Sequence, residues 1–583
     1  MLPMSSILTF GLLLIGLVGA LDTGNHPEWP RWCGKVYQPH FPPGGQTVEP
    51  ALLPDGPALD VQFKPRYSIY LAGGQLAEFI VKANPSPWRG QKWPNLNKAS
   101  PSPPPPLFFN ISLVSNKRVL VSDRLDISSS SSTSSTPSHD VFTFDLSQYD
   151  LTPRFEPYQV VLTGADPSGT YHISATSELV FLPDKKTGSI TRLDHLNGGI
   201  LFRSAATNHM FEPFLPFGYY ASCDRFLCDK DYVAKVKAYQ ALGMNSMVSL
   251  TTVQDSGPVY KLMDGLDMRY MYDLREWYKN LTAVREQVSV IRDFEGLYSY
   301  WGADEPDGHQ DPFNLLPEAR DAIRQLDPYH PVSVTLNCQD FYFDEYTAGA
   351  DIIMEDAYPI GINSSFSKWG TPCNATYGDC GCDNCQGNVQ DVSSRLDTLS
   401  RYETWLGLWP KTKAHNPQTF HGEGYWSRDP TDEEVVAMNA LAFHHGAKLI
   451  AGWVWPFTDS LGKTMGSFGA KVSKSPVREF VVTGELIQFD IAGINNDDAS
   501  SMVEAACWVG ERVGEQNNKV LVSVVNGGHE AIDAEVSISL PRGLVVKGLE
   551  EVVWGNGTWT WTAGILKLGK QSAMATNMVI MHV

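Results

Sequence analysis

The chain has 583 residues, of which 43% are hydrophobic and 19% charged, and this composition excludes a disordered acidic tail, a collagen-like polymer and a disulfide-only mini-protein. Its net charge of -20 repels polyanions, so we expect no nucleic acid or membrane partner but a neutral or cationic one. At roughly 100–200 residues per domain, the length predicts three or four domains, or fewer if one is a large barrel. The 16 Trp and 23 Tyr suit either a core or platforms for flat ligands such as carbohydrate.

The N-terminus begins with an apolar run, residues 7–21, that is too short to span a bilayer and ends in the small-residue pattern Val18-Gly19-Ala20. This pattern is typical of a signal peptide, here residues 1–20, and predicts a secreted protein, extracellular or in the cell wall. Five sequons agree with this and predict N-glycosylation at Asn110, Asn280, Asn363, Asn374 and Asn556.

Most of the nine cysteines lie close together in sequence, as a cluster (Cys373, Cys380, Cys382 and Cys385) and a pair (Cys223 and Cys228). In an oxidising compartment we expect disulfides in a long loop rather than a zinc site, and we expect no metal elsewhere. Because nine is odd, at least one thiol stays free or pairs with another chain. The isolated Cys338 and Cys507 are the candidates.

The two ends of the chain have the pattern of β-sandwich-like domains. In residues 21–194, short alternating segments at 109–114, 141–146 and 158–162 are interrupted by a Pro-rich stretch (100–106) and a Ser-rich stretch (128–135), which we expect to be exposed loops. In residues 485–583, turn residues separate similar segments at 520–525, 534–540, 551–554 and 578–582.

The central part, residues 195–484, alternates short β-branched or aromatic runs with helical patterns. The runs are 214–220, 246–250, 266–272, 297–301, 332–336, 352–354, 419–422 and 449–455. Eight alternations within the 244 residues from 214 to 457 predict an α/β fold with a central (β/α)8 barrel, also called a TIM barrel. A doubly wound open sheet is the alternative, but it usually has fewer strands and a Gly-rich first turn, which is missing here. Before the last run, Thr431 and Glu434 form a predicted capping box.

Two acidic residues stand out, because barrel enzymes place their catalytic groups at the carboxyl ends of the strands. The fourth run leads into Asp304-Glu305-Pro306, and the predicted seventh run leads into Glu423. Strands four and seven lie across a barrel from each other, so the two carboxylates are expected to face each other over its mouth. Glycosidic bond cleavage uses such a pair, and a separation of ~5–5.5 Å gives retention of configuration. The alternative is that both residues are structural: Glu305 begins a polar loop, and Glu423 forms an ion pair with a nearby Arg.

On these motifs, residues 214–457 resemble the barrel of the large clan of retaining glycoside hydrolases that have an acid/base on strand four and a nucleophile on strand seven. The resemblance implies that Glu305 is the acid/base, that Glu423 is the nucleophile, and that Tyr358 after strand six hydrogen-bonds the nucleophile. The strand-eight Trp of that clan corresponds to Trp453 or Trp455. Only these short motifs carry the likeness.

One residue departs from the clan's pattern. The Asn that usually precedes the acid and contacts the sugar 2-hydroxyl is Asp304 here. A carboxylate accepts from a hydroxyl or pairs with a 2-amino group, so the substrate preference is open. Asp304 also places a like charge beside Glu305. This charge is expected to raise the proton affinity of Glu305, which suits a general acid.

Other polar and aromatic residues at the ends of the runs are weaker candidates for substrate binding. Asp273, Arg275, Asn337, Glu355 and Asp356 are equally suited to bind sugar hydroxyls or to form structural ion pairs. Trp426, Trp453 and Trp455 are suited to stack on sugar rings, although we expect only one of the two strand-eight Trp residues to face inward, and we assign Trp455 to the substrate.

The sequence therefore predicts a secreted glycoside hydrolase that needs no cofactor and acts on an oligo- or polysaccharide. A transglycosylase with the same two Glu residues and a non-catalytic carbohydrate-binding glycoprotein remain as alternatives.

Overall fold

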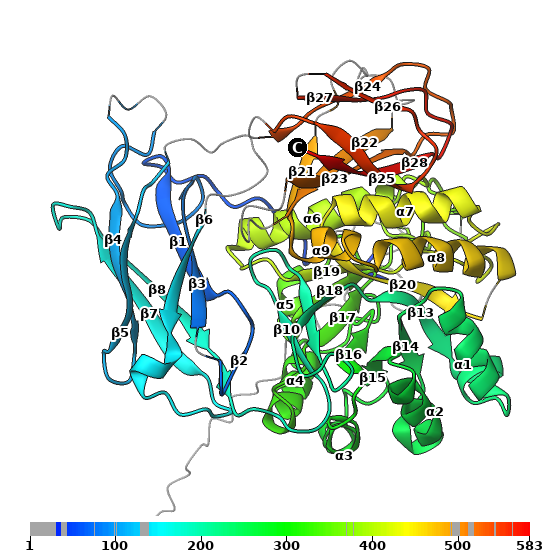
Figure 1. Ribbon diagram of the computed structural model, residues 1–583, viewed down its shortest axis with the longest axis horizontal. Coiled ribbons are helices and arrows are strands. Elements are labelled where there is room, and N and C mark those ends of the chain that lie inside the picture. Colours follow the sequence, from blue (N-terminus) through cyan, green and yellow to red (C-terminus); the bar gives the residue numbers. More distant parts are fainter. Residues whose placement is uncertain are drawn as a thin grey trace, which may run out of the picture.

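The structure is a computed structural model, and it describes residues 31–35, 44–74, 76–97, 100, 102–128, 139–368, 370–376, 378–456, 458–489, 491, 502–510, 518–541, 544–562 and 564–583. The predicted signal peptide and most of the Ser-rich stretch lie outside the described residues. Figure 1 shows the central barrel with a β-domain beside it and a second β-domain above it.

The centre of the molecule is a closed barrel of eight parallel strands, which confirms the predicted α/β fold class. The strands are β13 (Phe217–Ser222), β14 (Ser246–Leu250), β15 (Arg269–Asp273), β16 (Leu297–Asp304), β17 (Val332–Leu336), β18 (Ile352–Glu355), β19 (Thr412–His415) and β20 (Ala447–Trp455). The helices are α1 (Tyr232–Ala241), α2 (Val253–Gly265), α3 (Leu281–Ile291), α4 (Leu315–Leu326), α5 (Phe343–Thr347), α6 (Gln390–Leu406), α7 (Asp432–His444), α8 (Asp459–Val472) and α9 (Val477–Thr483).

The prediction for strand seven is wrong. The strand is β19, which lies before the predicted run at 419–422. Its sequence, Thr-Lys-Ala-His, lacks the apolar pattern of a buried parallel strand. Two side chains explain the exception: Lys413 forms an ion pair with Glu403 of α6, and His415 pairs with Glu355 of β18. Both pairs are buried, so polar residues occupy positions that usually carry Val or Ile.

A small antiparallel sheet closes the amino end of the barrel. It consists of β10 (Ile190–Leu193), β11 (Ile200–Arg203) and β12 (Glu212–Phe214). Phe202 and Phe214 join the apolar cluster of the barrel interior, and the Phe214 ring lies 5.4 Å from that of Tyr298 on β16. The carboxyl end of the barrel is therefore the end at which a pocket is free to form.

The N-terminal β-domain is a sandwich of two antiparallel sheets. One has the order β1 (Ala58–Pro65), β3 (Leu76–Ser86), β6 (His139–Asp145), and the other the order β5 (Val119–Leu125), β4 (Leu107–Leu113), β7 (Tyr158–Ala165), β8 (His172–Leu179). Their facing side chains form one core, which includes Phe79, Phe109 and Leu162. A two-stranded sheet, β2 (Tyr70–Leu71) with β9 (Phe181–Leu182), adjoins it.

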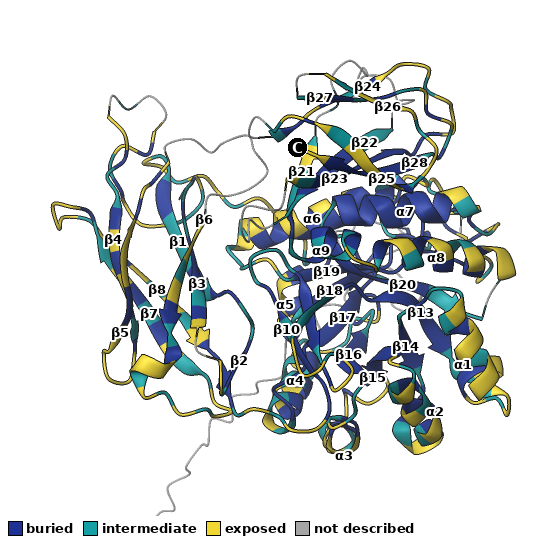
Figure 2. Cartoon of the chain, viewed as in Figure 1, coloured by how far each residue is buried: buried dark blue, intermediate teal, exposed yellow. Residues whose placement is uncertain are grey.

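The C-terminal β-domain also has two sheets. The larger has the order β21 (Glu485–Phe489), β22 (Val503–Val509), β23 (Lys519–Asn526), β28 (Thr576–His582), β25 (Gly548–Trp554), and the smaller the order β24 (Val536–Ser539), β27 (Ile565–Leu568), β26 (Trp559–Thr562). One face of the larger sheet, with Trp508 and Met578, packs into the same apolar cluster as the barrel helices. Figure 2 shows α7 buried beneath this sheet.

The cysteines form four disulfides: Cys33–Cys338, Cys223–Cys228, Cys373–Cys380 and Cys382–Cys385. Of the two candidates for the left-over thiol, Cys338 is the wrong one, because it pairs with Cys33, which lies 305 residues away in sequence, and spacing gave no sign of the pair. Cys507 is free, and it is buried in the C-terminal sandwich.

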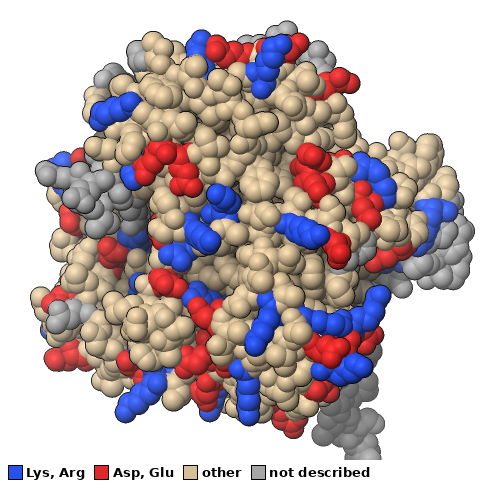
Figure 3. Space-filling model, turned by 45° about the vertical axis from the view of Figure 1, so that its right-hand side comes forward, with Lys and Arg blue, Asp and Glu red and all other residues tan. Residues whose placement is uncertain are grey.

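The described surface carries both positive and negative side chains, and the predicted sequons lie on it. Figure 3 shows Lys and Arg side chains interspersed with Asp and Glu over one face of the molecule. All five sequon asparagines are exposed, so their glycosylation stays a prediction that the fold permits. Within the described part of the chain, no helix has the length and apolar character needed to cross a membrane.

Candidate active site

A cavity of about 280 Å³ opens at the carboxyl ends of the barrel strands. Its polar lining includes Asp304, Glu305, Asn337, Asp356, Asn416 and Glu423, and its aromatic lining includes Trp32, Tyr220, Tyr358, Phe420, Tyr425, Trp426 and Trp453. Most of the predicted catalytic and substrate-binding residues therefore meet in one place. Asp273, Arg275, Glu355 and Trp455 do not line the cavity.

Two carboxyl groups and one amide form the polar centre of the cavity. Glu305 follows β16, Asn337 follows β17, and Asp356 follows β18. The Asn337 Nδ2 donates to Glu305 Oε1 at 2.9 Å and to Asp356 Oδ1 at 3.3 Å. Glu305 and Asp356 are also hydrogen-bonded to each other. Because an ionised carboxylate only accepts hydrogen bonds, this carboxyl pair holds one proton between its members.

Electrostatics favours keeping that proton near neutral pH. Burial and the adjacent Asp356 raise the pKa of Glu305 well above its ordinary value, and the hydrogen bond from Asn337 offsets part of the rise. Burial also raises the pKa of Asp356, to about 7. Two like charges in contact cannot both form without cost, so the pair titrates as a unit.

Asp304 lies on the other side of Glu305 and is paired differently from the sequence-based expectation. Burial and the Glu305 charge raise the pKa of Asp304 itself, while the neighbour that acts on Glu305 is Asp356. Arg275 contacts Asp304, with Nη1 3.4 Å from Oδ2, and forms an ion pair with Asp273 at 3.3 Å. Asp273 and Arg275 therefore support Asp304 from outside the cavity.

Glu423 reaches the cavity from a loop rather than from the end of a strand. It lies in a tight turn closed by the hydrogen bond from the Gly422 N–H to the Trp426 carbonyl, 2.7 Å long, with a φ of 55°. Its side chain is exposed, and partial burial raises its pKa. Among the described residues, no hydrogen bond joins Glu423 to Tyr358, so the interaction implied by the resemblance is absent.

Aromatic rings form much of the cavity wall. The Tyr358 ring meets Phe420 edge-on at 5.0 Å and Trp426 at 6.0 Å, and the Trp426 indole donates to the Tyr358 carbonyl at 2.8 Å. On the opposite strands, the Trp453 ring lies 5.3 Å from that of Tyr220. These rings leave a flat, partly apolar surface around the carboxyl pair.

Trp455 was the wrong choice between the two strand-eight tryptophans. The register between β13 and β20 shifts, so that Tyr219 opposes Gly452 but Ala221 opposes Trp455. After this irregularity Trp455 packs against Tyr219 and Tyr239 on the outside of the barrel, at ring distances of 5.5 and 5.4 Å. Trp453 is left to line the cavity.

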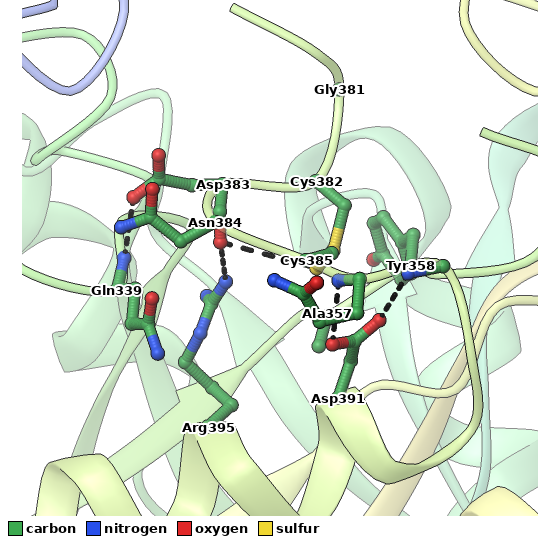
Figure 4. Close-up of a disulfide and its surroundings, with 12 residues drawn as sticks. Gln339, Ala357, Tyr358, Gly381, Cys382, Asp383, Asn384, Cys385, Asp391 and Arg395 are labelled. Carbon is green, nitrogen blue, oxygen red and sulfur yellow. Dashed lines mark hydrogen bonds between the residues drawn. A yellow bond between two sulfur atoms is a disulfide. The ribbon is translucent and has the colours of Figure 1, made fainter. Parts of the chain in front are cut away.

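A disulfide-rich loop between β18 and α6 covers one side of the mouth and contributes Asp379 and Gly381 to the cavity. Figure 4 shows how it is fixed near Cys382–Cys385. Arg395 of α6 donates to the Asp383 carbonyl at 2.7 Å and to the Asn337 carbonyl at 2.6 Å. The same guanidinium thus ties the loop to the residue that bridges the carboxyl pair.

Sequence reasoning missed or underrated several lining residues. Asp356 directly follows the predicted sixth strand, so the rule that selected Glu305 also selects it. Asn416 follows β19 and was hidden by the misplaced strand; its amide donates to the Tyr220 hydroxyl at 3.0 Å, and its buried Oδ1 has no partner among the described residues. Trp32 lies near the N-terminus, far in sequence from the barrel strands, and no local sequence pattern connects it to the barrel.

No metal site accompanies the cavity: the described residues hold no group of three or more His, Cys, Asp or Glu side chains that could bind a metal ion. The polar lining is suited to proton transfer and to hydrogen bonds with hydroxyl groups.

Comparison with known proteins gives distant structural matches only. No protein-family model and no curated protein matches the chain. Among solved structures, a β-glucuronidase from Ruminococcus gnavus matches with 11% identity and a TM-score of 0.32, over 68% of this chain and 61% of that one, less than two thirds of its length. A putative β-galactosidase from Bacteroides fragilis matches with 11% identity and a TM-score of 0.33, over 89% and 69%. α-Galactosidase I from Mortierella vinacea matches with 11% identity and a TM-score of 0.39, over 63% and 96%. At these TM-scores the matches carry no argument about the site.

Proposed function

We propose that this protein is a secreted glycoside hydrolase that cleaves O-glycosidic bonds of an oligo- or polysaccharide with retention of configuration. Glu305 acts as the general acid and base, and Glu423 acts as the nucleophile. The observation that carries the proposal is the contact of Glu305 and Asp356 with one amide, that of Asn337, inside an aromatic-walled cavity. Burial and the adjacent Asp356 raise the pKa of Glu305 there, which suits a general acid.

The mechanism follows from the difference between the two glutamates. Glu305 is protonated because it is buried beside Asp356, and it gives its proton to the leaving oxygen. Glu423 is exposed at the cavity rim, so it holds a negative charge more readily and is free to attack the anomeric carbon. After the leaving group departs, a water molecule gives a proton to Glu305 and its oxygen attacks the anomeric carbon, which breaks the bond to Glu423 and releases the sugar.

Other lining groups suit recognition of a sugar. The unpaired Asn416 Oδ1 accepts from a substrate hydroxyl, and Trp426 and Trp453 offer faces on which a sugar ring stacks. Asp304 adds an acceptor that suits a hydroxyl or an amino group at the neighbouring sugar carbon. The four disulfides agree with the proposed secretion.

The test is a glycan panel incubated with the purified protein, with the anomeric configuration of the first product followed by proton NMR. We expect retention, and we expect Glu305→Gln and Glu423→Gln each to lower kcat by roughly 10²–10⁴-fold. Glu286→Gln, an exposed glutamate on α3, is the matched control and should leave turnover unchanged. Full activity in both site variants would overturn the assignment.

Asp356 is the alternative second carboxylate, and azide separates the two possibilities. In Glu423→Ala, azide fills the vacated space and attacks the anomeric carbon once, giving a glycosyl azide of inverted configuration. If azide gives the glycosyl azide with Asp356→Ala and not with Glu423→Ala, the nucleophile is Asp356. An inverted product from the unaltered protein makes Glu423 a base rather than a nucleophile. Sugar transfer to an added acceptor in place of hydrolysis identifies a transglycosylase, and binding without turnover identifies a non-catalytic protein.

A further inference from the structure

Residues 31–35, which we call the N-terminal strap, are fixed on the mouth of the barrel far from their position in sequence. The Cys33–Cys338 disulfide joins the strap to the loop after β17. The Lys35 Nζ forms an ion pair with Asp383 and donates to Asn384 Oδ1 at 2.8 Å in the disulfide-rich loop. The strap thus connects two of the loops that surround the cavity.

The strap places the Trp32 ring in the cavity wall. The ring meets His309 edge-on at 5.0 Å, and it lies against Gly308 so closely that a Cβ there would be 2.4 Å from Trp32 Cζ2. Only glycine at position 308 leaves room for the indole. The seat is therefore shaped for this one side chain.

The indole N–H has a specific acceptor: Trp32 Nε1 donates to Asn337 Oδ1 at 2.8 Å. An indole nitrogen only donates, so it accepts no hydrogen bond from the amide nitrogen of Asn337. This contact directs Oδ1 toward Trp32 and Nδ2 toward Glu305 and Asp356, as the observed distances show.

We propose that Trp32 is a positioning residue that fixes the side-chain amide of Asn337 and, through it, the protonation of the Glu305–Asp356 pair. The Cys33–Cys338 disulfide holds Trp32 in place for this role. The inference rests on the proposed function only in that glycosidic cleavage is one of its two readouts.

The backbone of Asn337 is held independently of Trp32, which makes the role separable. Its N–H donates to Asp307 at 3.3 Å, and its carbonyl accepts from Arg395 at 2.6 Å. Loss of the indole N–H therefore frees the side-chain amide to turn and leaves the loop in place. A turned amide presents an acceptor to the carboxyl pair, which favours the protonated form and raises the pKa of the pair.

The charged groups that face the pair come from several elements. Asp304 and Asp307 flank Glu305 in sequence, Glu423 faces it from the loop after β19, Arg395 reaches Asp356 from α6, and Arg275 lies behind Asp304. None of these groups is altered by a substitution at position 32. A shift in the titration of the Glu305–Asp356 pair in such a variant therefore reflects a change in the Asn337 amide.

The experiment compares Trp32→Phe, which keeps a ring in the wall but removes the N–H, with the unaltered protein. Because Glu305 must be protonated to act as the acid, activity is lost as pH rises through the pKa of the pair, and we expect the alkaline limb of the kcat/KM profile to move to higher pH by about half to one unit, while KM stays within about twofold. Trp88→Phe is the matched control, because Trp88 makes a surface indole hydrogen bond to Glu49; it should leave the profile unchanged. A superimposable profile for Trp32→Phe overturns the proposal.

A second readout needs no substrate. A higher pKa of the pair makes the native state keep its proton to higher pH, so the unfolding free energy of Trp32→Phe should fall more steeply between about pH 6 and 8 than that of the unaltered protein. If the protein cleaves no glycan, the proposed function fails and this readout still decides the role of Trp32. Equal slopes contradict it.

The strap itself is tested with the double variant Cys33→Ser/Cys338→Ser. Release of the strap removes both the donor and the ring, so we expect the same shift of the alkaline limb together with a rise in KM. A shift in the double variant without one in Trp32→Phe would mean that the strap acts through the backbone, and would reject Trp32 as the positioning residue.

Discussion

Asp307 is a buried carboxyl group that holds the loop after β17 through hydrogen bonds to its backbone. It is 1% exposed and accepts the backbone N–H groups of Gly308 at 2.9 Å, Asn337 at 3.3 Å and Cys338 at 2.8 Å. Burial raises its pKa to about 7 in spite of these hydrogen bonds. A single side chain thus supports both the amide that bridges the carboxyl pair and the cysteine that anchors the strap.

We expect the contribution of Asp307 to stability to decrease with rising pH. An unfolded Asp loses its proton near pH ~3.9, whereas the folded Asp307 keeps it to about 7. The folded state therefore holds the extra proton between these values, and the unfolding free energy falls as pH rises through this window.

The check is urea unfolding of Asp307→Asn and the unaltered protein at several pH values. At pH 5 the variant should be less stable by about 1–3 kcal/mol, because its amide nitrogen cannot accept a backbone N–H. The difference should shrink by pH 8, since only the unaltered protein titrates. A difference that stays constant with pH would refute the raised pKa.

At the scale of elements, α7 begins with the capping box that the sequence predicts. The Thr431 side chain accepts from the Glu434 N–H, and the Glu434 side chain accepts from the Thr431 N–H. Arg428 also binds Glu434, with both contacts at 2.7 Å. The cap therefore joins the start of α7 to the loop that carries Glu423.

Thr431→Ala should lower the unfolding free energy by about 1 kcal/mol, the usual cost of losing an N-cap side chain. Ser394→Ala, on the exposed face of α6, is the control and should change it by no more than about 0.5 kcal/mol. Chemical denaturation at pH 7 measures both. An equal effect of the two substitutions would show that the cap adds nothing.

Most elements of the barrel could be predicted from periodicity, and the exceptions have physical causes. The strands with apolar patterns, such as 246–250 and 332–336, have the predicted bounds. β19 was missed because its Lys413 and His415 are neutralised by partners on α6 and β18, and such partners are not visible in a local pattern. Trp455 was misassigned because a register shift reverses the side of the strand that it occupies.

The same limit applies to the site. Glu305 and Asn337 were found because each follows an apolar strand directly. Glu423 was predicted to follow a strand at 419–422, but these residues form no strand. The loop that carries Glu423 nevertheless brings it to the cavity. The Trp32 contact joins residues 305 positions apart, so only the folded chain reveals it.

At the scale of the whole molecule, His445 connects the barrel to the C-terminal domain. Its Nδ1 lies 2.6 Å from Asp397 of α6, and its Nε2 lies 2.7 Å from Glu504 of β22. Hydrogen bonds to these two carboxylates raise the pKa of His445 to about 9, although burial opposes the rise. The imidazolium is therefore charged at neutral pH and bridges the two domains.

His445→Gln should destabilise the protein at pH 6 by on the order of 1–3 kcal/mol, because a charge-assisted interaction is lost. A folded pKa above the unfolded value of ~6.5 gives stability that is present below pH 6.5 and is lost as pH rises through about 9. The difference between variant and unaltered protein should therefore diminish by pH 9.5 in thermal unfolding. A difference that grows with pH would contradict this assignment.

The free thiol of Cys507 makes the C-terminal domain separately observable. Its side chain is fully buried, burial raises its pKa to about 12, and the other eight cysteines are disulfide-bonded. A thiol reagent therefore finds no reactive target in the native protein, and modification proceeds only when the sandwich around Cys507 opens. The rate at which Cys507 is labelled therefore measures how often the sandwich around this one thiol opens.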